Sequence, residues 1–271
     1  MKLVVVFFLL FFLPGFLSAQ LSDLKFERIK EYTFPQLIEV WSVDNLGNVY
    51  VIQGNTLVKC DSTGKQTYSQ SIKSLGEISE IEPINAMKIV LFSEEQQTIC
   101  FVDNTLTING DCKNLDAFEV QNAMFIATSN RPNLIWVYDE FKSTLLLIDI
   151  VKDKILQRVQ NLKGMIETKA ELIEMKEKDN YLYVTTSDGL VYVFDQLLSE
   201  TGNVYNGFEK MWKANHKILV SKIQNSIVFR DELKDKSQRL ECPVIDVIDF
   251  KIQGDFFYFR TLKKISKYSV N

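Results

Sequence analysis

The sequence predicts an all-β protein, a six-bladed β-propeller closed by pairing of the N-terminal strand with the last blade. Three observations predict this fold. A strand-like cluster recurs six times, and turn residues around the clusters divide the sequence into the short strands of one small sheet per recurrence. A further strand-like segment, with no partner of its own, precedes the first recurrence. Successive clusters are separated by about 40 residues, and such a period made of short strands is typical of a β-propeller, in which each repeat forms one blade. The six clusters are centred on Tyr50, Val90, Trp136, Tyr183, Leu219 and Tyr258.

The first recurrence has the pattern of one complete blade. Residues 38–61 contain three short runs of alternating apolar and polar side chains, separated by turn residues at 45–48 and at Gly54-Asn55. A further turn leads into a fourth run over residues 65–72, so four strands are predicted. The same order of runs and turns returns over residues 78–103, 172–195 and 244–270.

Two segments depart from this regular pattern. Residues 122–141 open the third blade with an insertion at Pro132, for which we expect a longer loop on one face. Residues 165–179 are rich in Glu and Lys, which are good helix formers, but their position in the repeat favours a strand with a loop.

The second strand of each predicted blade is apolar on both faces, as in V-Y-V around Tyr50 and F-Y-F around Tyr258. Strands of this kind are buried on both sides. The middle of a propeller blade is covered by its two neighbours, so we expect the aromatic centres Tyr50, Trp136, Tyr183 and Tyr258 to be packing residues.

The two ends of the chain supply the closing sheet. After Tyr258 the sequence has room for one more strand, which leaves the sixth blade one strand short. Asp23–Phe34 alternates apolar and polar residues and precedes the first blade without a partner. Pairing this segment with the last blade would close the ring and cover an exposed sheet edge.

The segment 1–20 has the pattern of a secretory signal peptide. One lysine precedes an apolar stretch over residues 3–13, and the small pair Ser18-Ala19 follows a Pro-Gly break. The stretch is shorter than the roughly 20 residues that span a bilayer, which argues against a transmembrane anchor. We therefore expect a signal peptide at 1–20 and a single propeller domain at 21–271. The mature protein is expected in the periplasm or peripherally at the outer membrane, with no direct membrane anchor.

Charge argues against a nucleic-acid partner. The chain has 31 Lys and Arg against 35 Asp and Glu, a net charge of -4, and no basic block. Proteins that bind nucleic acid present clustered basic residues, so none is expected to bind here.

Four cysteines remain in a chain that is expected to be exported, where disulfides are allowed. Cys100 and Cys112 fall on predicted neighbouring strands of one blade and are the favoured pair, among three possible pairings of four cysteines. The alternative is that all four are small core hydrophobes. Zinc is not expected, because the chain has no C-x-x-C and its one histidine is His216, in a predicted turn.

The runs D-N-L-G-N-V-Y-V at 44–51 and L-V-K-C-D-S-T-G-K at 57–65 resemble the repeats of the NHL and quinoprotein-like propeller superfamilies, and S-D-G-L-V-Y-V-F at 187–194 does so in part. The signal peptide ends in Ser-Ala-Gln and the remaining chain is rich in Lys, Ile and Asn. These features look like those of exported proteins from Bacteroidota-type Gram-negative bacteria.

The resemblance implies where chemistry would lie. Six-bladed propellers of the lactonase-like family hold a metal on the central axis, with oxygen ligands from several blades. The acidic residues in the predicted inner segments are scattered, and each lies where a solvent-exposed strand edge would also place a charged side chain. They are Glu39, Glu80, Glu119, Glu171 and Asp246. No metal site is predicted. The repeated tryptophan-docking pattern of quinone-dependent propellers and a G-x-S-x-G motif are also absent, so no cofactor and no catalytic residue is predicted.

Two functions are compatible with these observations. The first is a non-enzymatic scaffold that binds proteins in the cell envelope, as an accessory subunit of an outer-membrane assembly or secretion complex. The second is an extracytoplasmic enzyme or ligand binder that acts on sugars or lactones. Acids and amides converging on the axial channel would favour the second, and an apolar or lysine-capped channel would favour the first.

Candidate residues for binding a protein partner are aromatic and arginine residues, together with an adjacent proline, because Trp, Tyr and Arg are enriched at binding hot spots. They are Trp41, Arg131, Pro132, Trp212 and Arg230. For Trp41 and Trp212, a place in the core is an equally good interpretation.

Overall fold

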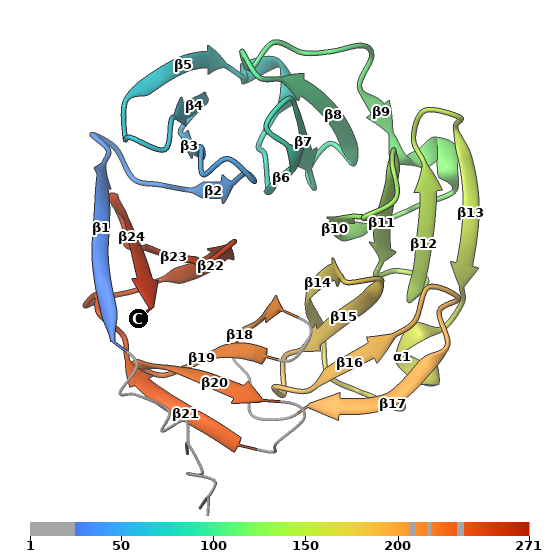
Figure 1. The fold of residues 1–271 in the computed structure, drawn as a ribbon. Coiled ribbons are helices and arrows are strands. Elements are labelled where there is room, and N and C mark those ends of the chain that lie inside the picture. Colours follow the sequence, from blue (N-terminus) through green and yellow to red (C-terminus); the bar gives the residue numbers. More distant parts are fainter. Residues whose placement is uncertain (1–24, 206–209, 216–217, 232–235, 271) are drawn as a thin grey trace, which may run out of the picture.

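The computed structural model describes residues 25–205, 210–215, 218–231 and 236–270 (Figure 1). The predicted signal peptide and His216 lie outside the described residues. The described chain forms six four-stranded antiparallel sheets arranged around one axis. The fold is a six-bladed β-propeller.

The blades follow the order of the chain, and each runs from an inner to an outer strand. Blade one is β2 (Val40–Val43), β3 (Val49–Gln53), β4 (Thr56–Cys60) and β5 (Gln66–Ser71). Blade two is β6 (Glu80–Asn85), β7 (Lys88–Ser93), β8 (Thr98–Asp103) and β9 (Lys113–Asn114). Blade three is β10 (Ala123–Thr128), β11 (Leu134–Asp139), β12 (Thr144–Asp149) and β13 (Lys154–Val159). Blade four is β14 (Leu172–Lys178), β15 (Tyr181–Thr186), β16 (Val191–Phe194) and β17 (Glu200–Tyr205). Blade five is β18 (Lys210–Asn215), β19 (Ile218–Ile223), β20 (Ser226–Asp231) and β21 (Lys236–Glu241). Blade six is β22 (Asp249–Gln253), β23 (Phe256–Arg260), β24 (Lys264–Val270) and β1 (Phe26–Thr33).

The six sequence centres all lie on the second strand of a blade, which confirms the predicted repeat. Every residue of β3 and β11 is buried, whereas every residue of the outer strand β5 is exposed. The aromatic centres Tyr50, Trp136, Tyr183 and Tyr258 are buried, as packing residues should be.

The hydrophobic core lies between blades. One cluster joins Trp136 and Leu147 of blade three to Val184 and Phe194 of blade four. Comparable clusters join blades one and two, two and three, five and six, and six and one. Each blade is therefore stabilised by its neighbours, and apolar burial depends on the presence of the whole ring.

Helices are short and few among the described residues. They are η1 (Lys73–Leu75), η2 (Leu115–Phe118) and α1 (Leu162–Met165). The helix-forming segment 165–179 consists of the last residue of α1, a loop and strand β14, which confirms the strand interpretation. No helix in this part of the chain is long and apolar enough to cross a membrane.

Aspartates at the ends of third strands shape the turns that follow. Asp61 accepts hydrogen bonds from the backbone N–H groups of residues 63 and 65, and Asp103 and Asp195 accept the same two bonds in blades two and four. Such side-chain bonds replace backbone partners in a tight turn. Hydrogen bonds from the hydroxyls of Thr63 and Thr105, together with these backbone bonds, hold the pKa of Asp61 and Asp103 below its ordinary value.

A disulfide links Cys100 on β8 to Cys112, the residue before β9, and so ties the last two strands of blade two together. Cys60 is buried in blade one and Cys242 is partly buried after β21; neither is disulfide-bonded.

The ring is closed by β1, which pairs antiparallel with β24 from Phe26 opposite Val270 to Thr33 opposite Lys264 (Figure 1). The inward side of this pair is apolar, since Tyr32 and Ile265 are both buried. The ring of Phe26 also lies edge-on to three aromatic rings of blade six, with centroids 5.4 to 6.0 Å apart. The predicted closure is confirmed.

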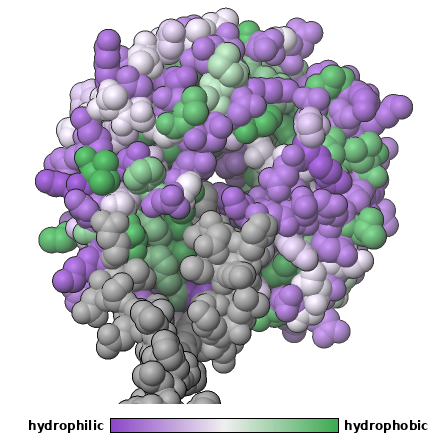
Figure 2. All heavy atoms as spheres, in the orientation of Figure 1, coloured by the Kyte–Doolittle hydropathy of each residue, from purple (hydrophilic) through white to green (hydrophobic). Residues whose placement is uncertain are grey.

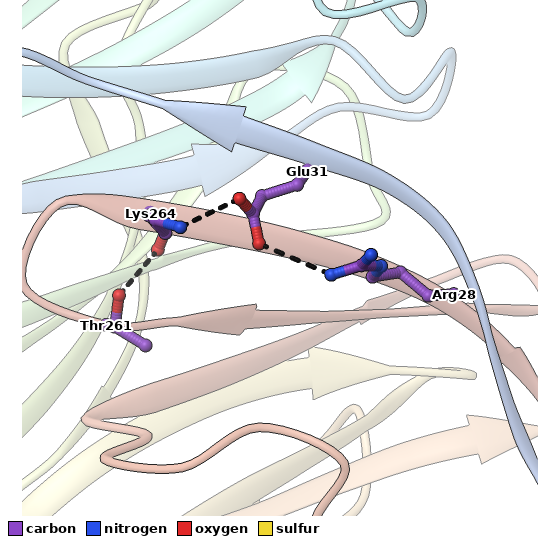
Figure 3. A network of polar contacts seen from close by, with 4 residues as sticks. All are labelled: Arg28, Glu31, Thr261 and Lys264. Carbon is purple, nitrogen blue, oxygen red and sulfur yellow. Dashed lines mark hydrogen bonds and ion pairs between the residues drawn. The ribbon is translucent and has the colours of Figure 1, made fainter.

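Charged side chains lie on the outer surface of the β1–β24 pair (Figure 3). Glu31 lies 2.9 Å from Lys264 and 3.6 Å from Arg28, and all three side chains are at least one-third exposed. Each exposed ion pair contributes between about 0 and 1 kcal/mol to the free energy of unfolding. The closed ring is therefore stabilised mainly by the β1–β24 backbone hydrogen bonds and by the buried side chains.

Deleting Leu21–Phe34 should abolish soluble expression, because blade six loses its outer strand and β24 becomes an open edge. Soluble yield and a thermal melt of the purified protein measure this effect. The matched control is Glu31→Ala, which removes the exposed ion pairs but keeps the strand and should lower the free energy of unfolding by at most about 1 kcal/mol. A soluble deletion variant that melts cooperatively would show that the ring does not need this closure.

Candidate functional site in the axial channel

The axial channel contains two cavities that meet at its middle. The first cavity, of about 300 Å³, lies where the inner strands begin, and the second, of about 320 Å³, lies where they end. Both are lined by Glu82, Lys176 and Lys251, on the inner strands of blades two, four and six. Figure 2 shows mainly hydrophilic residues around the central opening.

These three mid-channel residues occupy one repeated position. In the strand ladders Glu82 lies opposite Val90, Lys176 opposite Tyr183 and Lys251 opposite Tyr258. Each is therefore the ladder partner of a sequence centre. The same register places Ser42, Ala127 and Lys213 opposite the other three centres. We refer to Glu82, Lys176 and Lys251, which line both cavities, as the mid-channel ring.

The first cavity is rich in carboxylates. Its charged lining residues are Glu39, Glu80, Glu82, Glu174, Asp249, Lys176, Lys251 and Arg260. Among the described residues, five carboxyl groups therefore face three cationic groups, beside the indole of Trp41 and several aliphatic side chains.

Several of these groups join blade six to blade one. Trp41 Nε1 donates a hydrogen bond to Asp249 Oδ2 at 2.7 Å, and Lys251 Nζ lies 3.4 Å from Ser42 Oγ and 5.7 Å from the Trp41 ring centroid. Arg260 donates to the carbonyl oxygen of Ile38 at 2.6 Å. Burial lowers the pKa of Arg260 from its ordinary value, although Asp249 opposes the shift. These contacts hold blade six against blade one.

Glu80 joins blade two to blade three. Its Oε2 atom accepts a hydrogen bond from the backbone N–H of Ile126 at 3.1 Å. Burial in the channel wall, helped by the nearby carboxylate of Glu82, raises the pKa of Glu80 to about 8. Lys251 and the Ile126 N–H favour the charged form but are outweighed. At neutral pH the folded protein therefore holds a proton on Glu80.

Among the described residues, the second cavity has fewer carboxylates than the first and shares Glu82, Lys176 and Lys251 with it. Its charged lining residues are Glu82, Glu177, Lys176, Lys178 and Lys251. The buried Glu177 accepts hydrogen bonds from the Trp136 indole and from the backbone N–H of Asn130, so it joins blades four and three. Neutral polar side chains, among them Ser42, Ser129 and Gln253, complete the wall.

The structure separates the residues that the sequence suggested for partner binding. Trp41 is buried and lines the first cavity, whereas Arg131 and exposed Pro132 lie in the turn after β10, at the opposite end of the channel. The Arg131 guanidinium lies 5.8 Å from the Trp136 ring centroid, and its Nε lies 3.4 Å from Ser129 Oγ. Arg230 is partly exposed on β20, a third strand. Trp212 belongs to β18, but its side chain is outside the described residues.

Only some of the acids considered from the sequence reach the channel. Glu39 and Glu80 line the first cavity, whereas exposed Glu119 forms an ion pair with Arg158 at 2.9 Å. Glu171 and Asp246 line neither cavity. Within the described residues no group of three or more His, Cys, Asp or Glu side chains is placed to hold a metal ion.

The sequence analysis missed Glu82, Glu174, Lys176, Asp249 and Lys251. Their signal is a repeated pair of charged residues two positions apart on inner strands, in E-I-E, E-M-K and D-F-K. Alignment of each inner strand with its sequence centre would have found them.

No protein-family model matches the chain, and no curated protein matches it. Solved structures match the fold along nearly its whole length. The WD40 domain of Neurospora crassa Pan2 has a TM-score of 0.59 at 10% identity, covering 90% of this chain and 95% of that one. A chain of a mitotic checkpoint complex has a TM-score of 0.63 at 8% identity, with coverages of 98% and 99%. Virginiamycin B lyase from Staphylococcus aureus has a TM-score of 0.63 at 10% identity, with coverages of 91% and 99%. At these identities the likeness concerns the propeller fold alone.

Glu80 should make stability depend on pH in an uncommon direction for a carboxylate. The folded protein keeps the proton up to about pH 8, whereas an unperturbed glutamate loses it near 4.5. The folded state therefore binds more protons over that range, and the free energy of unfolding should fall as pH rises, by at most about 1.4 kcal/mol per pH unit from this group. Glu80→Gln should flatten this fall.

Urea unfolding at several pH values between 5 and 9 measures the effect. Glu95→Gln, at an exposed position of blade two, is the matched control and should retain the wild-type pH dependence. Identical pH profiles for wild type and Glu80→Gln would contradict the protonated Glu80.

Proposed function

We propose that this chain is an exported, non-enzymatic β-propeller that acts as a protein-interaction scaffold in the cell envelope, as an accessory subunit of an outer-membrane assembly or secretion complex. Its location would be periplasmic or peripheral to the outer membrane. The signal-peptide pattern of residues 1–20 supports export, and the NHL-like runs of blade one support a propeller of that superfamily type. The Ser-Ala-Gln ending supports a Bacteroidota-type source.

The observation that carries the scaffold proposal is a set of exposed apolar residues at one end of blade six. Leu37, Ile245, Ile248 and Leu262 are 48 to 81% exposed. They lie on the β1–β2, β21–β22 and β23–β24 connections, and antiparallel pairing puts these connections at the same end of the blade. We call these four residues the blade-six patch.

Backbone contacts tie the connections of the blade-six patch together. The N–H of Ile38, next to Leu37, donates to the carbonyl of Leu262 at 2.8 Å, and the N–H of Ile248 donates to the carbonyl of Arg260 at 2.8 Å. The patch borders the mouth of the first cavity, which Arg260 lines. Exposed apolar residues held together on loops beside a polar rim are typical of protein-binding surfaces.

Related folds give this proposal context. Solved structures with a similar fold include a chain of a mitotic checkpoint complex, so propellers of this shape are found in protein assemblies. A partner protein is thus the simplest ligand for the blade-six patch.

A second candidate function is an extracytoplasmic enzyme or ligand binder that acts on sugars or lactones. The polar channel favours it, because carboxylates from several blades converge there. One of the similar structures is a lyase. The mixture of lysines with these carboxylates fits neither the acid-and-amide channel expected of an enzyme nor the lysine-capped channel expected of a scaffold.

Mild crosslinking of the tagged protein in its native envelope, followed by affinity purification and mass spectrometry, should recover a reproducible set of envelope proteins. Ile245→Asp with Leu262→Asp should reduce their recovery at least tenfold, because a buried, unpaired carboxylate opposes apolar docking. The matched control is Leu46→Asp with Leu197→Asp. These leucines are 66% and 79% exposed but lie on turns at the opposite end of their blades.

Retention of the wild-type partners by the control and their loss from the patch variant would support the proposal. Recovery of the wild-type protein alone would contradict a scaffold and favour the ligand-binding candidate. Equal recovery by both variants would contradict the blade-six patch as the docking surface.

A further inference from the structure

We infer that the free edge of β5 is a docking surface for a second copy of this chain, which adds its own β5 antiparallel across a twofold axis. This inference goes beyond the scaffold proposal. It concerns the outer strand of blade one, which lies on the rim of the ring, and not the blade-six patch (Figure 1).

The first observation is that β5 presents free backbone groups on its outer side. β5 is the last strand of its sheet, so its outer side has no strand partner among the described residues. The N–H of Ile72 donates to the carbonyl of Asn55, the residue before β4, at 2.9 Å. Backbone groups alternate along an antiparallel strand, so those of Gln70 also face β4, and those of Ser69 and Ser71 face outward. An added strand would pair with these outward N–H and C=O groups.

The second observation is that β5 lacks the protection of the other outer strands. It reads Q-T-Y-S-Q-S, with no charge, proline or glycine, and every one of its residues is exposed. Each of the other outer strands of the described chain carries at least one charged residue. In addition, β9 has only two residues, and the registers of β1 and β17 are irregular. Charge, irregular register and short length keep sheet edges from pairing with other chains.

The composition of β5 favours a second β5 as its occupant. A twofold axis near Ser69 and Gln70 brings the same stretch of both copies together, so only Ser, Thr, Gln and Tyr side chains face one another. Hydroxyl and amide groups both donate and accept hydrogen bonds, so identical residues complement each other. Tyr68, which is 42% exposed, adds an aromatic ring to the paired surface. A charged residue near the axis would instead meet its own charge.

The size of the edge sets the strength of the association. Exposed Lys65 and Lys73 flank β5 and limit the uncharged stretch to the strand and the buried Ile72 after it. A pair of six-residue strands is small beside a standard protein interface, so the dissociation constant should be on the order of 100 µM. The dimer therefore forms where the protein is locally concentrated.

Sedimentation velocity of the full propeller, from about 10 µM to 1 mM, measures this association. The wild type should change from monomer to dimer over this range and stop there, because the twofold pair uses the free edge of both copies. Ser69→Lys and Ser69→Glu should each weaken dimerisation about tenfold or more, because each places like charges near the axis.

An equimolar mixture of Ser69→Lys and Ser69→Glu should dimerise again, because opposite charges then meet near the axis. This rescue distinguishes a lost contact from a misfolded variant, and thermal melting of each variant verifies the fold. Asn203→Lys and Asn203→Glu, at an exposed position of the outer strand β17, are the matched controls and should dimerise as the wild type does.

The inference is overturned by a wild-type propeller that stays monomeric at about 1 mM. It is also overturned by self-association that the Ser69 variants leave unchanged, or by a mixture of the two variants that does not dimerise. A monomeric wild type whose Ser69 variants lose envelope proteins in the affinity purification would assign the edge to a strand of a different protein, and would overturn the inference as well.

Discussion

The pairing of β1 with β24 is the interaction on which the rest of the structure depends. The core lies between blades, so each sheet buries its faces only while both neighbours are present. An open ring would expose the facing sides of the first and last blades together with the free edge of β24. Building blade six from both ends of the chain removes that edge. The partly buried Phe26 and the buried Tyr32 supply more stability than the exposed ions around Glu31 can.

Ring geometry also explains the polar channel. Inner strands have hydrogen-bonding partners on one side only, and groups that face the axis must find others across blade boundaries. The Trp41 indole does so with Asp249, Glu177 with the Trp136 indole of the next blade, and the Ile126 N–H with Glu80. Charged residues that satisfy the fold in this way make the first-cavity end of the channel rich in carboxylates among the described residues. The candidate site is therefore a consequence of how neighbouring blades are joined, and it gains rigidity from the same contacts.

The fold could be predicted from the sequence because its strongest signal is local. Each second strand is apolar on both faces and bounded by turn residues, and it recurs at the blade-length period of a propeller. Asp23–Phe34 had no other partner. The channel was harder to predict. Glu119 and Glu80 look alike in sequence, yet one is on an exposed turn and the other faces the axis. Only the strand register, such as Glu82 opposite Val90, tells which charged residues share a level of the channel.

Native-state hydrogen exchange, followed by mass spectrometry, tests the central claim of a ring that opens only as a whole. The account predicts that amides of β1 and β24 exchange at the same slow rate as those of the buried strand β3, because opening of the closing pair requires global unfolding. Rapid exchange throughout β1, while β3 remains protected, would contradict it, since the remaining blades would then be stable without closure.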